Sequence, residues 1–151
     1  MKASAERPPA RLRIVIADDF VGLFADLPEL AGLREIGEVV RHAERPADER
    51  ALAGRLAGAA AVITVRAAFT RFPAELLASL PDLRLIAVAG TGTQDVDVGA
   101  ATRLGIAVTN AAGASARSVA ETTIGLVLAL AHHIARLDRA AGSRPRIHTS
   151  W

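Results

Sequence analysis

Short apolar runs alternate with stretches of helical periodicity along the first 110 residues of the chain. Runs of this length, rich in β-branched and aliphatic residues, are typical of buried strands and occur at residues 12–17, 38–42, 60–65, 83–89 and 106–109. Between them, leucine and isoleucine recur at helical spacing, which predicts helices over residues 24–35, 47–56, 73–80 and 97–104. Pro28 and Pro73 fall at helix starts, Gly37 and Gly105 fall where helices would end, and Asp97 is placed as a helix cap.

This alternation predicts an α/β domain with a doubly wound, parallel, five-stranded sheet. The predicted strands are almost entirely apolar, as expected when both faces of a sheet are covered. Ligands of such sheets bind beyond the carboxyl ends of the strands. The residues predicted to lie there are Asp18, Asp19, Arg66, the Gly90–Thr93 loop and Asn110.

The alternation stops after the fifth strand, and a long apolar helix follows. Ser118 and Glu121 have the spacing of a capping box, which predicts a helix of about 20 residues ending near Ala141, before Gly142. Apolar residues surround much of this helix, so it needs protein on most sides. We therefore expect a flexible N-terminus (1–11), a sheet domain (12–117), and a long inter-domain crossing helix that leads into a second, missing domain (118–151).

Composition narrows the classes of function. The chain has 151 residues, 51% of them hydrophobic and 23% charged, which suits a packed core. It contains no cysteine, which excludes disulfides, thiolate nucleophiles and cysteine zinc sites. Only 3% of residues are aromatic and the net charge is +2, so we expect no nucleic-acid partner. We expect a cytoplasmic protein without membrane contact, because no apolar leader and no uncharged run of membrane-spanning length are present.

Three groups of polar residues are candidates for chemistry. The Gly90–Asp95 loop lacks the third glycine of a dinucleotide fingerprint and the lysine of a P-loop, so it is either an anion cradle of backbone amides or a tight glycine turn. Arg66 either binds a carboxylate or phosphate or is a solvated strand-end arginine. Asp18 and Asp19 are expected to form a turn or cap. His132 and His133 are adjacent and would point about 100° apart on a helix, so we expect no metal site.

The order of motifs along the chain resembles the D-isomer-specific 2-hydroxyacid dehydrogenases, and 3-phosphoglycerate dehydrogenase-like members most closely over residues 62–134. The resemblance rests on Val65-Arg66, Val88–Asp97 (Val-Ala-Gly-Thr-Gly-Thr-Gln-Asp-Val-Asp), Ala100–Asn110, Ser118–Glu121 and Ile124-Gly125. It implies a flavodoxin-like substrate-binding domain, followed by a long helix that crosses into an NAD-binding Rossmann domain.

The resemblance also implies roles for individual residues. Backbone amides around Thr91 and Gly92 would hold the substrate carboxylate, with Thr91 also near the cofactor. Arg66 would bind the substrate, and Ser115 would lie at the mouth of the active site. Val119 would touch the nicotinamide cofactor. The substrate would be a small 2-hydroxy or 2-oxo acid, the cofactor NAD with NADP as an alternative, and the assembly a homodimer formed through the crossing helix.

Three departures limit what can be transferred from the family. Gln94-Asp95 replaces the usual Asp-Asn, and Ala112 and Gly113 replace a proline-containing turn. The family's Gly-x-Gly-x-x-Gly motif and its catalytic Arg, Glu and His all come after the crossing helix, so no catalytic residue is assigned here. We therefore expect the N-terminal portion of an NAD-dependent dehydrogenase, inactive alone. The alternative is a stand-alone anion-binding or oligomerisation module without catalysis.

Overall fold

The computed structural model describes residues 11–65 and 70–142 of the chain. Of the features singled out in the sequence, Arg66 and the terminal segments 1–10 and 143–151 lie outside the described residues.

The strands form one parallel sheet in the order β2-β1-β3-β4-β5. They are β1 (Leu12–Ile16), β2 (Gly37–Arg41), β3 (Ala61–Val65), β4 (Leu85–Ala89) and β5 (Ala107–Asn110). This is the flavodoxin-like order, in which the chain reverses its direction of winding next to the first strand. The predicted doubly wound, parallel, five-stranded sheet is confirmed, because each strand occurs where an apolar run predicted it.

Six helices lie in the described part of the chain. They are α1 (Leu30–Ile36), α2 (Glu49–Leu56), α3 (Ala74–Ala78), α4 (Val98–Arg103), α5 (Ala116–Ala131) and α6 (Ile134–Gly142). Carboxylates cap two of them: Asp48 accepts the Ala51 N–H at 2.7 Å, and Asp97 accepts the Ala100 N–H at 2.8 Å. The cap predicted at Asp97 is confirmed, whereas the cap at Asp48 was not anticipated.

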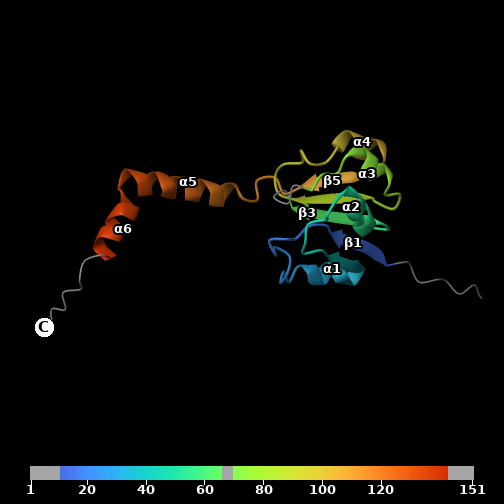
Figure 1. Cartoon of the computed structure of the whole chain (residues 1–151), viewed down its shortest axis with the longest axis horizontal. Helices are drawn as coiled ribbons and strands as arrows, with labels where there is room; N and C mark the ends of the chain where they lie inside the picture. Colours follow the sequence, from blue (N-terminus) through green and yellow to red (C-terminus); the bar gives the residue numbers. More distant parts are fainter. Residues whose placement is uncertain (1–10, 66–69, 143–151) are drawn as a thin grey trace, which may run out of the picture. The chain divides into compact units, whose positions relative to one another are not determined.

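Alternate residues of the strands build the main core on one face of the sheet. Val15, Val62 and Ile86 lie side by side across β1, β3 and β4, and all are fully buried. They belong to one cluster with apolar residues of three helices: Leu52 and Leu56 of α2, Leu76 and Leu77 of α3, and Ala100 and Ala101 of α4. Figure 1 shows α3 and α4 on one side of the sheet and α1 on the other. Burial of each large aliphatic side chain contributes about 1.5–3 kcal/mol.

The first helix is shorter than its sequence pattern predicts. α1 begins at Leu30, because Gly22 is left-handed (φ 73°) and the Phe24 N–H donates to the Asp19 carboxylate, which holds the preceding residues in turns. Gly37 ends the helix, as the sequence predicted, and its extended backbone pairs with Leu12. A Cβ at Gly37 would overlap the Leu12 carbonyl, so close approach of two strands explains this glycine.

The predicted capping box is wrong. α5 begins at Ala116, and the Glu121 carboxylate accepts a hydrogen bond from Arg117 at 3.1 Å instead of reaching back to Ser118. The single long helix is also wrong, since His133 adopts φ 53° and separates α5 from α6, whose axes differ by 63°. A left-handed residue ends the regular backbone hydrogen bonding of a helix, and histidine adopts this conformation more readily than most residues do.

The chain divides into two compact units, one up to Ala112 and the other from Gly113 onward. The first contains the sheet and α1–α4, and the second contains α5 and α6. In the described residues, no single helix is both long and apolar enough to span a membrane, and only the bent pair α5–α6 meets the length and composition criteria together.

Candidate functional site

The loop after β4 presents backbone amides at the carboxyl edge of the sheet. This loop, residues 90–93, begins with Gly90, whose N–H donates to the Val88 carbonyl at 2.9 Å and turns the chain sharply out of the strand. A second turn follows, in which the Val96 N–H donates to the Thr93 carbonyl at 3.0 Å. Between these turns, the N–H groups of Thr91, Gly92 and Thr93 donate to no other described residue. Three successive uncommitted amides form a site that suits a carboxylate.

The loop is anchored on both sides. On the β5 side, the Asn110 side-chain amide donates to the Thr91 carbonyl at 2.6 Å, and the Ala111 N–H donates to the Gly90 carbonyl at 2.9 Å. On the β3 side, the Phe72 N–H donates to the Asp95 carbonyl at 2.7 Å. The amides are therefore held in place before a ligand arrives, which reduces the entropy lost on binding.

Two neighbouring aspartates at the end of β1 are buried and have different partners. Asp18 is 0% exposed and accepts the Val65 N–H at 3.3 Å and the Thr64 hydroxyl at 3.2 Å. Asp19 is 1% exposed and accepts Arg41 at 2.9 Å and the Phe24 N–H at 3.0 Å through one carboxylate oxygen. The expectation of a turn or cap is correct for Asp19 and wrong for Asp18, whose carboxylate bonds to β3.

Burial sets the protonation behaviour of this edge. Desolvation raises the pKa of Asp18 above its ordinary value of 3.8, and the neighbouring Asp19 adds to the rise, while hydrogen bonds from Thr70, Val65 and Thr64 oppose it. Desolvation also lowers the pKa of His42, with Arg55 and Arg13 acting in the same direction. Asp18 is therefore a carboxyl group whose charge is poorly compensated.

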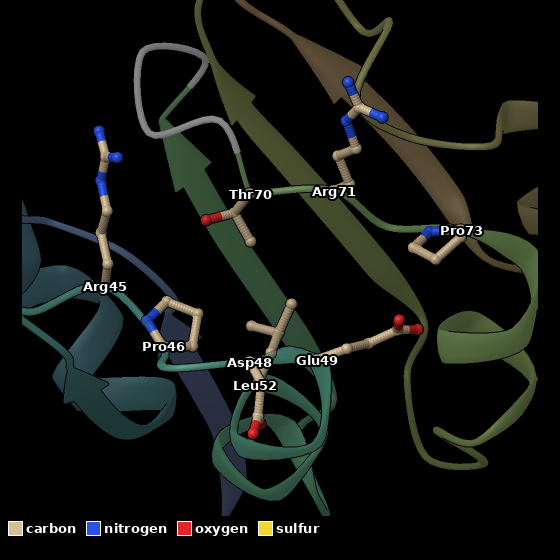
Figure 2. Close-up of a pocket in the computed structure, with 8 residues that line it drawn as sticks. All are labelled: Arg45, Pro46, Asp48, Glu49, Leu52, Thr70, Arg71 and Pro73. Carbon is tan, nitrogen blue, oxygen red and sulfur yellow. The ribbon is translucent and has the colours of Figure 1, made fainter.

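A cavity of about 500 Å³ lies beside the segment that follows β3. Figure 2 shows the Arg45 and Arg71 side chains on either side of Thr70, with the first turn of α2 below them. The lining also includes the carboxylates of Asp48 and Glu49, so its formal charges balance and it has no excess positive charge to select an anion.

Thr70 connects this cavity to the amide loop. It also lines a small cavity of about 10 Å³ with Thr64, Gly92 and Thr93, which is about the room one water molecule needs. The described residues contain no cluster of three or more His, Asp or Glu side chains that could hold a metal ion.

The structure places the predicted site residues in two groups. Thr91 and Gly92 lie in the amide loop of the first unit, as the sequence indicated. Ser115 and Val119 lie one helical turn apart in the second unit, where the Val119 N–H donates to the Ser115 carbonyl at 2.9 Å. Arg66 lies outside the described residues.

Sequence reasoning gave no role to the Asn110 side chain and did not identify Thr64 or Thr70. The position of Asn110 at a strand end was its only signal, and the contacts of the two threonines with Asp18 depend on the pairing of β1 with β3.

Comparison with known proteins places this geometry in a family. Residues 15–147 match the family model described as the D-isomer specific 2-hydroxyacid dehydrogenase catalytic domain. A hydroxypyruvate reductase of Thermotoga maritima is 48% identical over 75 residues, covering 50% of this chain and 24% of that protein. A putative 2-hydroxyacid dehydrogenase of Haemophilus influenzae is 46% identical over 81 residues, covering 54% and 25%. The chain thus spans about a quarter of the length of these curated relatives.

A solved structure agrees with these sequence matches. The NAD⁺-bound 3-phosphoglycerate dehydrogenase of Entamoeba histolytica superposes with a TM-score of 0.60 at 25% identity, covering 80% of this chain and 39% of that one. Together with the family-model match over most of its length, this likeness shows that the chain belongs to the D-isomer specific 2-hydroxyacid dehydrogenase family.

Proposed function

We propose that this chain supplies the substrate-binding part of an NAD-dependent D-2-hydroxyacid dehydrogenase. The observation that carries the proposal is the row of uncommitted amides at Thr91, Gly92 and Thr93, at the edge of the sheet where ligands of this fold bind. The substrate would be a small 2-hydroxy or 2-oxo acid, whose carboxylate accepts these N–H groups. Arg66, which follows β3 directly in the sequence, would supply the charged partner of the same carboxylate.

The chain's own residues would bind and orient the acid. Gly92 lets the backbone approach the carboxylate without a side chain in the way, and Asn110 fixes the direction of the loop through its bond to the Thr91 carbonyl. The nearby Asp97 carboxylate accepts the Ala100 N–H, which offsets part of its repulsion of an incoming anion. The acid would thus be held by its carboxylate, with its second carbon left open to a reaction partner.

The residues present do not fit a dinucleotide. Asp95 stands where the fingerprint after β4 would have its third glycine, and its carboxylate would repel a pyrophosphate. We therefore place the NAD site in a nucleotide-binding domain outside residues 1–151, and derive no step through NAD here. NADP is the alternative, because the acidic residue that distinguishes the two belongs to that domain. Ser115 and Val119 would face the active-site mouth and the nicotinamide.

The apolar surface of α5 would be covered in the whole enzyme. None of its residues is buried in the structure, and Ile124, Leu126 and Leu130 are 61%, 61% and 76% exposed. Large contiguous apolar surfaces of this kind are typical of interaction sites. The proposed occupants are the nucleotide-binding domain and a second copy of the chain, so that the enzyme is a homodimer.

An NMR titration of the 151-residue chain with glyoxylate tests the proposal. We expect saturable shifts at the amides of residues 90–93, and none with acetaldehyde, which lacks the carboxylate. Asn110→Ala should weaken binding about tenfold by freeing the loop, whereas Thr109→Ala, an exposed neighbour on β5, should leave it unchanged. Shifts that fail to saturate, or that are no larger at the loop than elsewhere, would contradict the proposal.

The second candidate is a stand-alone anion-binding or oligomerisation module, favoured by the same exposed helix. Both candidates predict self-association through this helix, so the ligand separates them. A stand-alone module would bind acetate as tightly as glyoxylate. The dehydrogenase part prefers the 2-oxo acid.

A further inference from the structure

His42 is a partly buried histidine at the carboxyl end of β2 that the proposed function does not use. The end of β1 fixes its backbone, because the His42 N–H donates to the Ile16 carbonyl at 3.0 Å and the Asp19 N–H donates to the His42 carbonyl at 2.8 Å. Its ring Nε2 atom is buried and has no hydrogen-bond partner among the described residues, so Nδ1 is the ring nitrogen that a ligand can reach. The neutral ring then carries its proton on Nδ1, since a buried N–H without an acceptor is costly.

Two arginines act on His42 with uncompensated positive charge. Arg55 of α2 donates to the carbonyls of Glu44 and Arg45 in the loop after β2. Arg13 of β1 donates to the Arg55 carbonyl at 3.0 Å. These acceptors are backbone carbonyls, and in the described part of the chain neither Arg13 nor Arg55 forms an ion pair with a carboxylate. Desolvation lowers the pKa of His42, and the charges of Arg55 and Arg13 lower it further, as expected where positive charge lacks a counterion.

A cavity of about 240 Å³ lies beside these residues and has room for a group of the size of phosphate. It is lined by Arg41, His42, Ala43, Glu44 and Arg55. Arg55 keeps three of its five N–H groups available, because its bonds to the loop use two. Arg41 is paired with the Asp19 carboxylate at 2.9 Å and so adds little net charge. The exposed Glu44 carboxylate belongs to the same lining and would weaken the binding of an anion.

This cavity is separate from the candidate substrate loop. β2 lies at one edge of the sheet, and β1 and β3 stand between it and β4, which leads into residues 90–93. Three strand spacings amount to about 14 Å, which is more than the length of a small 2-hydroxy acid. The cavity also shares no lining residue with the cavities of about 500 Å³ and 10 Å³ described above. One substrate molecule therefore does not occupy both places.

We propose that the cavity at the end of β2 is a second anion site, in which the Arg55 guanidinium and the His42 Nδ1–H bind a phosphate group. A guanidinium presents parallel N–H groups that match two phosphate oxygens, and the histidine donates to a third. The two charges of a phosphate dianion match those of Arg13 and Arg55, whereas a carboxylate would leave one of them uncompensated. The site does not depend on the proposed function, because none of these residues takes part in it.

An NMR titration of the 151-residue chain with inorganic phosphate, at constant ionic strength, tests the site. We expect saturable shifts at the amides of residues 42–44 and weaker binding of acetate. Arg55→Met should raise the dissociation constant about tenfold, because it removes the charged donor. Arg50→Met is the matched control, since Arg50 is an exposed arginine of the same helix, and it should leave the constant unchanged. Phosphate shifts confined to residues 90–93, or equal weakening in both variants, would overturn the proposal.

Two further variants decide the matter if Arg55→Met does not fold. Glu44→Gln should lower the dissociation constant of phosphate about twofold, since it removes a negative charge from the lining. His42→Ala should raise the constant about fivefold, because it removes the ring donor. Unchanged affinity in both variants would overturn the proposal.

A pH titration of the His42 ring gives a readout that a merely structural role would not change. Sulfate is a tetrahedral dianion like phosphate, and its charge is constant from acidic to neutral pH. Bound sulfate should raise the pKa of His42, followed by its ring proton signal, because the anion opposes the charges of Arg55 and Arg13. Sodium chloride at the same ionic strength should produce a smaller rise. A His42 pKa that is equal in the two salts would overturn the proposal.

Discussion

Apolar side chains are buried in the sheet unit and exposed in the helical unit. In the sheet unit, Ile86 and Leu56 are fully buried by other parts of the same unit. In the helical unit, no residue of α5 or α6 is buried, although Leu126, Val127, Leu128 and Leu130 follow one another closely. Both regions are comparably rich in aliphatic residues, and only the first contains the surfaces that cover them.

The difference shows what an apolar pattern does and does not predict. A sequence in which a strand pattern is followed by helical spacing supplies both the sheet face and the helix face that pack together. Burial of these side chains can therefore be predicted from one unit alone. A helix that is apolar on most faces predicts only that a partner is needed. The central claim is accordingly that the sheet unit is a complete acid-binding module, whereas hydride transfer needs a partner that covers the helical unit.

The largest expected effect is the loss of stability when a core residue is truncated. Ile86→Ala should lower the free energy of unfolding of the sheet unit by about 2–5 kcal/mol, because it leaves a cavity in the core beside β4, an interior strand of the sheet. Leu126→Ala, at a position that is 61% exposed, should change it by less than about 0.5 kcal/mol. Urea denaturation, monitored by far-UV circular dichroism, measures the free energy of unfolding of both variants. Equal losses would show that the helical unit buries Leu126 after all.

Association through α5 should be the next largest effect. Ile124 and Leu128 lie one turn apart on this helix, and replacing both by glutamate should weaken self-association by about 2 kcal/mol, as expected for lost apolar burial. Ile36→Glu is the matched control, since Ile36 is an exposed aliphatic residue of the sheet unit at 58%. Sedimentation velocity over a dilution series gives the result. If the unsubstituted protein is monomeric at every concentration, the proposed homodimer is wrong.

Helix caps provide a smaller and sharper comparison. Asp48→Ala should destabilise the sheet unit by about 1 kcal/mol, because the carboxylate accepts the Ala51 N–H at 2.7 Å. Ser115→Ala should leave stability unchanged, since the Ser115 side chain at the start of α5 makes no capping bond. Thermal unfolding of the two variants decides this. A loss for Ser115→Ala as large as that for Asp48→Ala would mean that the hydroxyl caps α5 in solution.

The smallest expected effect is a pH dependence that arises from Asp18. Its folded pKa is raised above the ordinary 3.8, so the protonated form favours folding. The stability of the wild type relative to Asp18→Asn should be greatest below about pH 3.8 and should fall as pH rises through the folded pKa. Chemical denaturation from acidic to neutral pH measures this difference. A relative stability that increases with pH would contradict the raised pKa.

Much of the sheet unit could be predicted from sequence because its signals are local. Apolar runs identified each strand, and the spacing of Asp97 before an alanine-rich segment identified its cap. The failures came from competition between local interactions. Glu121 could either complete the capping box with Ser118 or pair with Arg117, and in the structure it accepts a hydrogen bond from Arg117. The left-handed conformation of His133 has no counterpart in the apolar spacing, so the break between α5 and α6 was missed.

The candidate site was predictable only in part for the same reason. The glycines at positions 90 and 92 signalled a loop in which backbone amides are accessible. The bonds that hold this loop, from Asn110 and from Phe72, join residues distant in sequence and appear only once the strands are paired. Asp18 looked like a turn former because its partners lie more than 40 residues away.

One sample tests the central claim most directly. The amide spectrum of the 151-residue chain is recorded with glyoxylate and then with NADH or NADPH added, while glycolate formation is followed. We expect glyoxylate to shift the amides of residues 90–93, neither nucleotide to add further shifts, and no glycolate to form. Oxidation of either nucleotide with production of glycolate would show that these residues carry out hydride transfer unaided, which contradicts the claim.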